Sequence, residues 1–158
     1  IDLTPTLKMT EEAITQTGLY IYPALHGEVT LVQDNCEVGN NSDACGKGNY
    51  IEIKTTLTDN PVDDETAYYK TLYAFLRKGV LVHSGGGDES MISRSSTGLM
   101  GKRLGKLGNT GQSKGQHLHF EIKRGVQKDG KIIEQTLKTF YQLTLHRNCP
   151  LLTLMIFI

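Results

Sequence analysis

The feature of this sequence that most constrains its fold is the strict alternation of polar and apolar side chains over residues 117–122, HLHFEI. With the two-residue period of a β-strand, the polar residues fall on one face and the apolar residues on the other. The polar face carries His117, His119 and Glu121. Two imidazoles side by side on a pleated surface can hold a metal ion rigidly, although two half-exposed surface histidines explain the spacing alone equally well. The pattern therefore predicts a half-buried strand and, as a hypothesis, a zinc site on its polar face.

Other parts of the chain have the same strand character and are separated by polar or glycine-rich stretches. Residues 27–32 (GEVTLV) and 48–54 (GNYIEIK) alternate, and residues 67–76 (AYYKTLYAFL) are rich in the aromatic residues that favour strands. Residues 84–98 include three consecutive glycines and are predicted to form an exposed loop. Short strands joined by such turns predict an all-β fold, an antiparallel sheet arranged as a sandwich or open barrel, and not an α/β sheet.

The cysteines and the charge balance bear on compartment and partners. Cys36 and Cys45 flank a polar, turn-rich segment that is typical of a hairpin loop. A disulfide between them would indicate an oxidising, extracellular setting, and two free thiols in a loop are the alternative. The chain has 17 basic and 17 acidic residues and a formal net charge of zero, so no basic surface indicates nucleic acid as a partner.

Residues 108–122, GNTGQSKGQHLHFEI, closely resemble the signature G-N-T-G-x-S-x-G-x-H-L-H-F-E of the lysostaphin-like (LytM-type) zinc peptidases, which cut peptidoglycan cross-links. Further strands of that family have counterparts here in the same order, at residues 27–29 (GEV), 46–53 (GKGNYIEI) and 73–76 (YAFL). The resemblance implies a LytM-type peptidase domain over residues 1–125, truncated at its N-terminus. Residues 126–158 would then be a C-terminal extension of uncertain structure.

The resemblance also implies roles for individual residues. The family binds zinc through the His and Asp of an H-x-x-x-D motif, typically H-x-G-I-D, and through the second His of H-x-H. Residues 1–3 (IDL) resemble the end of the first motif, so Asp2 and His119 are the implied metal ligands and His117 is the implied catalytic residue. Without the downstream matches, Asp2 would be interpreted as a solvated residue near a chain end. The partner histidine is expected four positions before Asp2, ahead of the printed sequence.

The substrate site is implied more loosely. From their places in family motifs, Tyr73 and Asn109 are the expected substrate-binding residues. The polar loops over residues 59–65 and 84–98 are candidates for the walls of an active-site groove, because loops on a sheet scaffold usually carry substrate choice.

The chain departs from the family pattern at one position. Where the family has Y-A-H-L, residues 73–76 read Y-A-F-L, and Phe75 can neither accept nor donate a proton. One of the two catalytic histidines is therefore replaced. His83 lies eight residues further on, but its interpretation as a strand-end or loop histidine is favoured. Glu121 shares a face with the histidines and could support a ligand; the favoured interpretation is a surface carboxylate.

The resemblance implies a zinc-dependent endopeptidase that hydrolyses peptide cross-links or stems of bacterial peptidoglycan. We expect it to act outside the cytoplasm, in the extracellular space, cell wall or periplasm, or on a phage particle. The alternative is a catalytically degenerate domain of the same fold that binds wall peptides or regulates another wall hydrolase. A carbohydrate-binding or structural module with a chance H-x-H is disfavoured by the match over residues 108–122. With Asp2 and His119 as the only ligands, we expect weak zinc retention and little hydrolysis.

Overall fold

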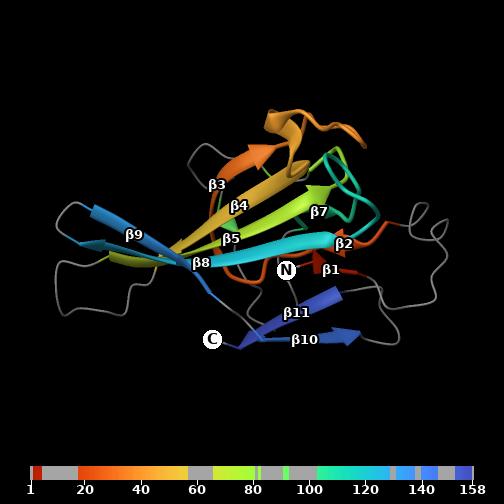
Figure 1. Ribbon diagram of the computed structural model, residues 1–158. Coiled ribbons are helices and arrows are strands. Elements are labelled where there is room, and N and C mark those ends of the chain that lie inside the picture. Colours follow the sequence, from red (N-terminus) through yellow and green to blue (C-terminus); the bar gives the residue numbers. More distant parts are fainter. Residues whose placement is uncertain are drawn as a thin grey trace.

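The computed structural model describes residues 2–4, 18–56, 66–80, 82, 91–92, 103–128, 131–137, 140–145 and 152–157. Within these ranges the chain is built from β-strands, and the helical structure is one short 3-10 turn, η1 (Asp43–Cys45) (Figure 1). The expectation of an all-β fold on an antiparallel sheet is confirmed. The strands are β1 (Asp2–Leu3), β2 (Tyr20–Ile21), β3 (Gly27–Gln33), β4 (Asn49–Thr56), β5 (Thr66–Leu76), β6 (Met91–Ile92), β7 (Gly105–Lys106), β8 (Leu118–Lys128), β9 (Lys131–Thr136), β10 (Phe140–Leu145) and β11 (Leu152–Phe157).

The main sheet places the strand with the histidines between β5 and two short partners. Among the described residues it has seven strands in the order β1-β8-β5-β4-β3-β6, with β9 also paired to β8. β5 runs antiparallel to β8 from Thr66 opposite Gln127 to Ala74 opposite His119. On the other edge of β8, β1 pairs with its beginning and β9 with its end. The two-residue strand β1 thereby lies at the histidine end of the sheet (Figure 1).

One face of this sheet is the core. The alternating apolar residues of β4, β5 and β8 point to it, and the segments around β2 and β7 cover it. Burying these side chains drives the alternation seen in the sequence, because the same strands leave their polar residues on the opposite face. The main members of the core are Leu19, Ile21, Val29, Ile51, Ile53, Tyr73, Leu76, Leu104, Leu107, Leu118, Phe120 and Ile122.

Two regions differ from the sequence prediction. Residues 84–98 are not loop throughout, because β6 lies within them and pairs with the edge of β3. The sheet also continues beyond residue 125: that position lies inside β8, and β9 extends the same sheet. The apolar run near the end of the chain forms β11, which pairs with β10 in a separate two-stranded sheet. The proposed groove wall over residues 59–65, and residues 84–98 apart from β6, lie outside the described residues. No helix in the described ranges is long and apolar enough to cross a membrane.

A buried polar network fixes the loop that leads into β8. The Thr110 hydroxyl accepts a hydrogen bond from the Asn49 amide at 2.8 Å and donates one to the Leu76 carbonyl at 2.7 Å. The Asn49 side chain in turn bonds both backbone groups of Cys36, at 2.8 and 3.0 Å. The disulfide expected between Cys36 and Cys45 is present and closes the β3–β4 loop against this network.

Two glycines allow the same loops to touch. Gly48 and Gly111 have φ values of 61° and 71°, in the left-handed region that favours glycine. A Cβ atom at Gly48 would lie 2.4 Å from the Thr110 carbonyl oxygen, and one at Gly111 would lie 2.3 Å from that of Cys45. The G-N-T-G part of the signature therefore has a packing role: it docks the loop before β8 against the disulfide loop.

Candidate metal and peptidase site

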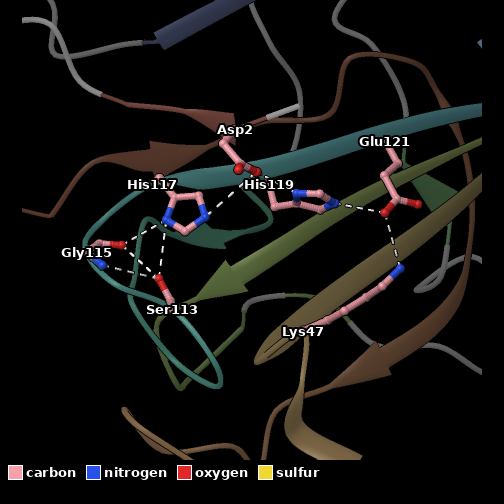
Figure 2. Close-up of polar contacts among 7 residues, drawn as sticks. All are labelled: Asp2, Lys47, Ser113, Gly115, His117, His119 and Glu121. Atoms are coloured by element: carbon pink, nitrogen blue, oxygen red, sulfur yellow. Dashed lines mark hydrogen bonds and ion pairs between the residues drawn. The ribbon is translucent and has the colours of Figure 1, made fainter. Parts of the chain in front are cut away.

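The side chains of Asp2, His119 and His117 meet at the edge of the sheet. β1 and β8 place Asp2 directly opposite His119, although the two residues are 117 positions apart in the chain. The Asp2 Oδ1 atom lies 2.6 Å from His119 Nδ1 and 3.8 Å from His117 Nε2 (Figure 2). The side chains of His117 and His119 are 15% and 26% exposed, and that of Asp2 is 62% exposed. The two ligands and the catalytic residue expected from the sequence thus form one cluster that is open to solvent.

The surroundings of His119 define where its protons lie. Its Nε2 atom is 2.8 Å from Glu121 Oε1, so the ring stands between two carboxylates (Figure 2). An ionised carboxylate only accepts hydrogen bonds, so Nε2 carries a proton and donates a hydrogen bond to Glu121. A bare Nδ1 lone pair facing the Asp2 oxygen at 2.6 Å would be repulsive. A proton therefore lies between these two atoms, which are at hydrogen-bond distance. The hydrogen bond to His119 holds the pKa of Asp2 below its ordinary value.

Glu121 is a partner of His119 and not an isolated surface carboxylate. Its side chain is 22% exposed, and the same Oε1 atom accepts a hydrogen bond from Lys47 Nζ at 3.2 Å. Partial burial raises the pKa of Glu121, but the hydrogen bonds from His119 and Lys47 outweigh it and the pKa is lowered overall. Glu121 therefore stays ionised and fixes the orientation of the His119 ring. Its position two residues after His119 on one strand face was the signal in the sequence.

The loop before β8 fixes His117 in a similar way. The His117 Nδ1 atom lies 2.8 Å from the Gly115 carbonyl oxygen and 3.3 Å from Ser113 Oγ (Figure 2). A carbonyl oxygen only accepts, so Nδ1 carries a proton that points to Gly115, and Nε2 faces the Asp2 side. Ser113 also donates to the Gly115 carbonyl at 2.9 Å, which holds the turn. Sequence reasoning assigned no role to Ser113, although it occupies the serine position of the signature.

Phe75 lies over both histidines. Its ring centroid is 4.7 Å from that of His117 and 5.9 Å from that of His119. Among the described residues it is the one non-glycine with a positive φ, at 60°, a conformation that costs about 1–3 kcal/mol for a bulky residue. Its amide is held by the Lys47 carbonyl at 3.1 Å. The position that carries a histidine in the resembling family is thus adjacent to the cluster and is apolar here.

The two expected substrate-binding residues lie in different settings. Tyr73 is 1% exposed, packs on Phe120 and accepts a hydrogen bond from the Ala24 amide at 2.7 Å. Burial raises the pKa of Tyr73 to about 12. The structure therefore gives Tyr73 a packing role in the core, not a surface that a substrate could touch. Asn109 lies in the loop before β8, and its Oδ1 atom is buried without a hydrogen-bond partner among the described residues. Its substrate role stays a prediction. His83 lies outside the described residues.

The donors at the cluster suit zinc, which takes imidazole nitrogen and carboxylate oxygen. The contact between Asp2 Oδ1 and His119 Nδ1 brings one donor of each kind together at the sheet edge. Within the part of the chain that the structure describes, no group of three or more His, Cys, Asp or Glu side chains is arranged to hold a metal ion. Asp2 and His119 would supply two ligands. Comparison with models of known protein families finds no match for this chain, and no curated protein matches it.

Proposed function

We propose that this protein is a zinc-dependent endopeptidase of the LytM type that hydrolyses peptide cross-links or stems of bacterial peptidoglycan. The observation that supports the proposal best is that three side chains meet on the outer face of the sheet. Asp2 Oδ1 lies 2.6 Å from His119 Nδ1 and 3.8 Å from His117 Nε2. The resemblance over residues 108–122 names His117 and His119, and that over residues 1–3 names Asp2. The disulfide between Cys36 and Cys45 supports a location outside the cytoplasm, in the extracellular space, cell wall or periplasm, or on a phage particle.

Asp2 and His119 would hold the zinc ion, together with the histidine that the resemblance expects four positions before Asp2. Bound zinc would polarise the scissile carbonyl and make the attacking water more acidic. Glu121 accepts a hydrogen bond from Nε2 of His119. This contact keeps Nδ1 turned toward Asp2. Carboxylates that orient a ligand histidine in this way raise its basicity and fix its tautomer.

His117 is the proton-transfer residue of the proposed reaction. Because Nδ1 is bonded to the Gly115 carbonyl, Nε2 is the atom that can accept a proton from water as the water attacks the peptide carbonyl. The same atom then returns the proton to the leaving amine, so the ring ends in its starting state. The protons balance with one histidine, whereas the family uses two; Phe75 at the second position predicts a slower reaction.

The test uses the chain with His-Ala-Gly placed before Ile1, which supplies the expected histidine four positions before Asp2. We expect zinc-dependent release of new amino groups from purified peptidoglycan, and loss of that release in His119→Ala and His117→Ala. The control is His26→Ala, because His26 is an exposed histidine away from the cluster. Release that persists in His119→Ala, or no release from the zinc-loaded chain with His-Ala-Gly before Ile1, would contradict an endopeptidase.

A second candidate function is a degenerate LytM-type domain that binds wall peptides or regulates another wall hydrolase. The specific observation in its favour is the Phe75 ring at 4.7 Å from His117, where a proton-transfer residue would be needed. A binding domain would sediment with peptidoglycan without releasing amino groups. In Phe75→His, an endopeptidase should release amino groups faster, whereas a domain that lacks other catalytic parts should remain inactive.

A further inference from the structure

The outer face of the sheet carries a hollow directly beyond the cluster. It has a volume of about 250 Å³ and is lined by residues of β3, β4, β5 and β8 and of the turn before β4. Glu121 and Lys47, which hold His119, form its wall nearest the histidines. Figure 2 shows these two residues on the side of His119 that faces away from Asp2. Leu72, directly opposite Glu121 on β5, gives the hollow an apolar floor. The hollow and the cluster therefore form one continuous surface.

The charges in the lining are unevenly matched. Lys47 is paired with Glu121 at 3.2 Å. Lys70 is paired with Glu134 at 2.8 Å and lies 3.9 Å from Glu52. Both carboxylates of the lining, Glu52 and Glu121, thus already have a cation.

Lys123 differs from the other two lysines of the hollow in its contacts. It makes no hydrogen bond or ion pair with any residue that the structure describes, and it stands directly opposite Lys70 in the register of β5 and β8. Like charges opposite each other destabilise a sheet pair. The charge of Lys123 contributes to lowering the pKa of Glu134. The Glu134 carboxylate, however, is hydrogen-bonded to Lys70 and, at 2.7 Å, to the Tyr68 hydroxyl. An incoming anion would therefore relieve a repulsion that the described part of the chain leaves in place.

We propose that this hollow binds a carboxylate of an extended peptide, with Lys123 as its counter-ion. Lys123 follows His119 by four residues on the same strand face, a distance of about 13 Å at the rise of a β-strand. A peptide lying along β8 has a similar rise, so its carboxylate is about four residues from the bond at the histidines. The location of that bond rests on the proposed function. The hollow thereby selects peptides that carry an acidic side chain or a free C-terminus at this distance.

The test measures binding without hydrolysis, by NMR titration of the whole chain in the presence of EDTA. Three probes are compared. They are acetyl-hexaalanine with a free C-terminal carboxylate, the same peptide as its C-terminal amide, and acetyl-pentaalanyl-glutamic acid α-amide, in which only the side-chain carboxylate is free. We expect at least one carboxylate peptide to bind about five-fold more tightly than the hexaalanine amide, with shifts in the Glu121 and Lys123 amide signals. Whichever carboxylate peptide binds more tightly identifies the source of the carboxylate.

Variants test whether the preference for carboxylate peptides depends on the Lys123 side chain. Lys123→Gln should abolish the preference, Lys123→Arg should keep it, and Lys131→Gln, at an exposed lysine outside the hollow, should leave it unchanged. The preference should also disappear in 1 M salt, where the screening length falls to about 3 Å. Equal binding of carboxylate and amide peptides, no binding of any peptide, or a preference that survives Lys123→Gln would overturn the proposal. Because zinc and hydrolysis take no part, failure of the peptidase proposal alone would leave this preference intact.

Discussion

The Thr110 hydroxyl gives the sharpest prediction about what the signature loop does for the fold. Thr110 is 4% exposed, and its hydroxyl joins the amide of Asn49 to the carbonyl of Leu76, both of which are fully buried residues. Thr110→Val keeps the shape of the side chain but leaves the Asn49 amide without its acceptor and removes a donor from the Leu76 carbonyl. An orphaned buried group costs about 1–3 kcal/mol and a lost hydrogen bond about 1 kcal/mol, so we expect the free energy of unfolding to fall by about 2–4 kcal/mol.

Thr110→Ser is the matched control, because it keeps the hydroxyl and removes one methyl group, worth about 0.8 kcal/mol. Both variants are measured by urea unfolding followed by circular dichroism. A free energy of unfolding for Thr110→Val within about 0.5 kcal/mol of that for Thr110→Ser would refute the argument that these two hydrogen bonds fix the loop.

Three further predictions concern other parts of the molecule. Replacing Cys36 and Cys45 by alanine opens a loop with a sequence separation of 9 and should lower the free energy of unfolding by about 2.5 kcal/mol in urea titrations; no change would contradict it. The hydrogen bond from Lys70 lowers the pKa of Glu134, so the stability that this carboxylate contributes is present above its ordinary value of 4.5 and is lost as pH falls through the lowered value. The free energy of unfolding of the wild type should therefore exceed that of Glu134→Gln by up to about 1 kcal/mol at pH 7. In urea unfolding this difference should shrink toward pH 3, and a difference that stays constant with pH would contradict the prediction. In the chain with His-Ala-Gly before Ile1, Glu121→Ala should weaken zinc binding about 10–100-fold by calorimetry, with partial rescue in Glu121→Gln; equal affinities would exclude the orienting role.

The main strands were predictable because each has a core face and a solvent face. The alternation over residues 117–122 predicts β8, since Leu118 and Phe120 are buried while His117 and His119 stay on the open face. Residues 27–32, 48–54 and 67–76 lie close to the observed bounds of β3, β4 and β5 for the same reason. Local sequence is enough where burial on one side forces a period of two.

The contacts that build the site were not predictable from local pattern. β1 has two residues and no periodicity, so its pairing with β8 carries no local signal, and only the resemblance connected Asp2 with His119. Lys47 reaches Glu121 from a turn 74 residues away.

A bulge explains the outcome at Tyr73. Tyr73 pairs with Ile51 of β4 and Leu76 pairs with Asn49, so β5 has one extra residue between these two pairs. Tyr73 and Leu76 therefore both face the core. Phe75, which a regular strand would place on the same face as Tyr73, instead turns its ring to the histidines with a positive φ. A one-residue irregularity reverses the facing of side chains, and the sequence of β5 contains no glycine to announce it.

The most direct test of the central claim is the zinc affinity of the chain with His-Ala-Gly before Ile1, compared with Ala-Ala-Gly at the same place. We predict 1:1 binding that is at least about 100-fold tighter with the histidine, lost in Asp2→Ala and in His119→Ala, and weak in the chain without any extension. Equal affinity for the two extensions, tight binding by residues 1–158 alone, or tight binding that survives Asp2→Ala would contradict a zinc site at this cluster.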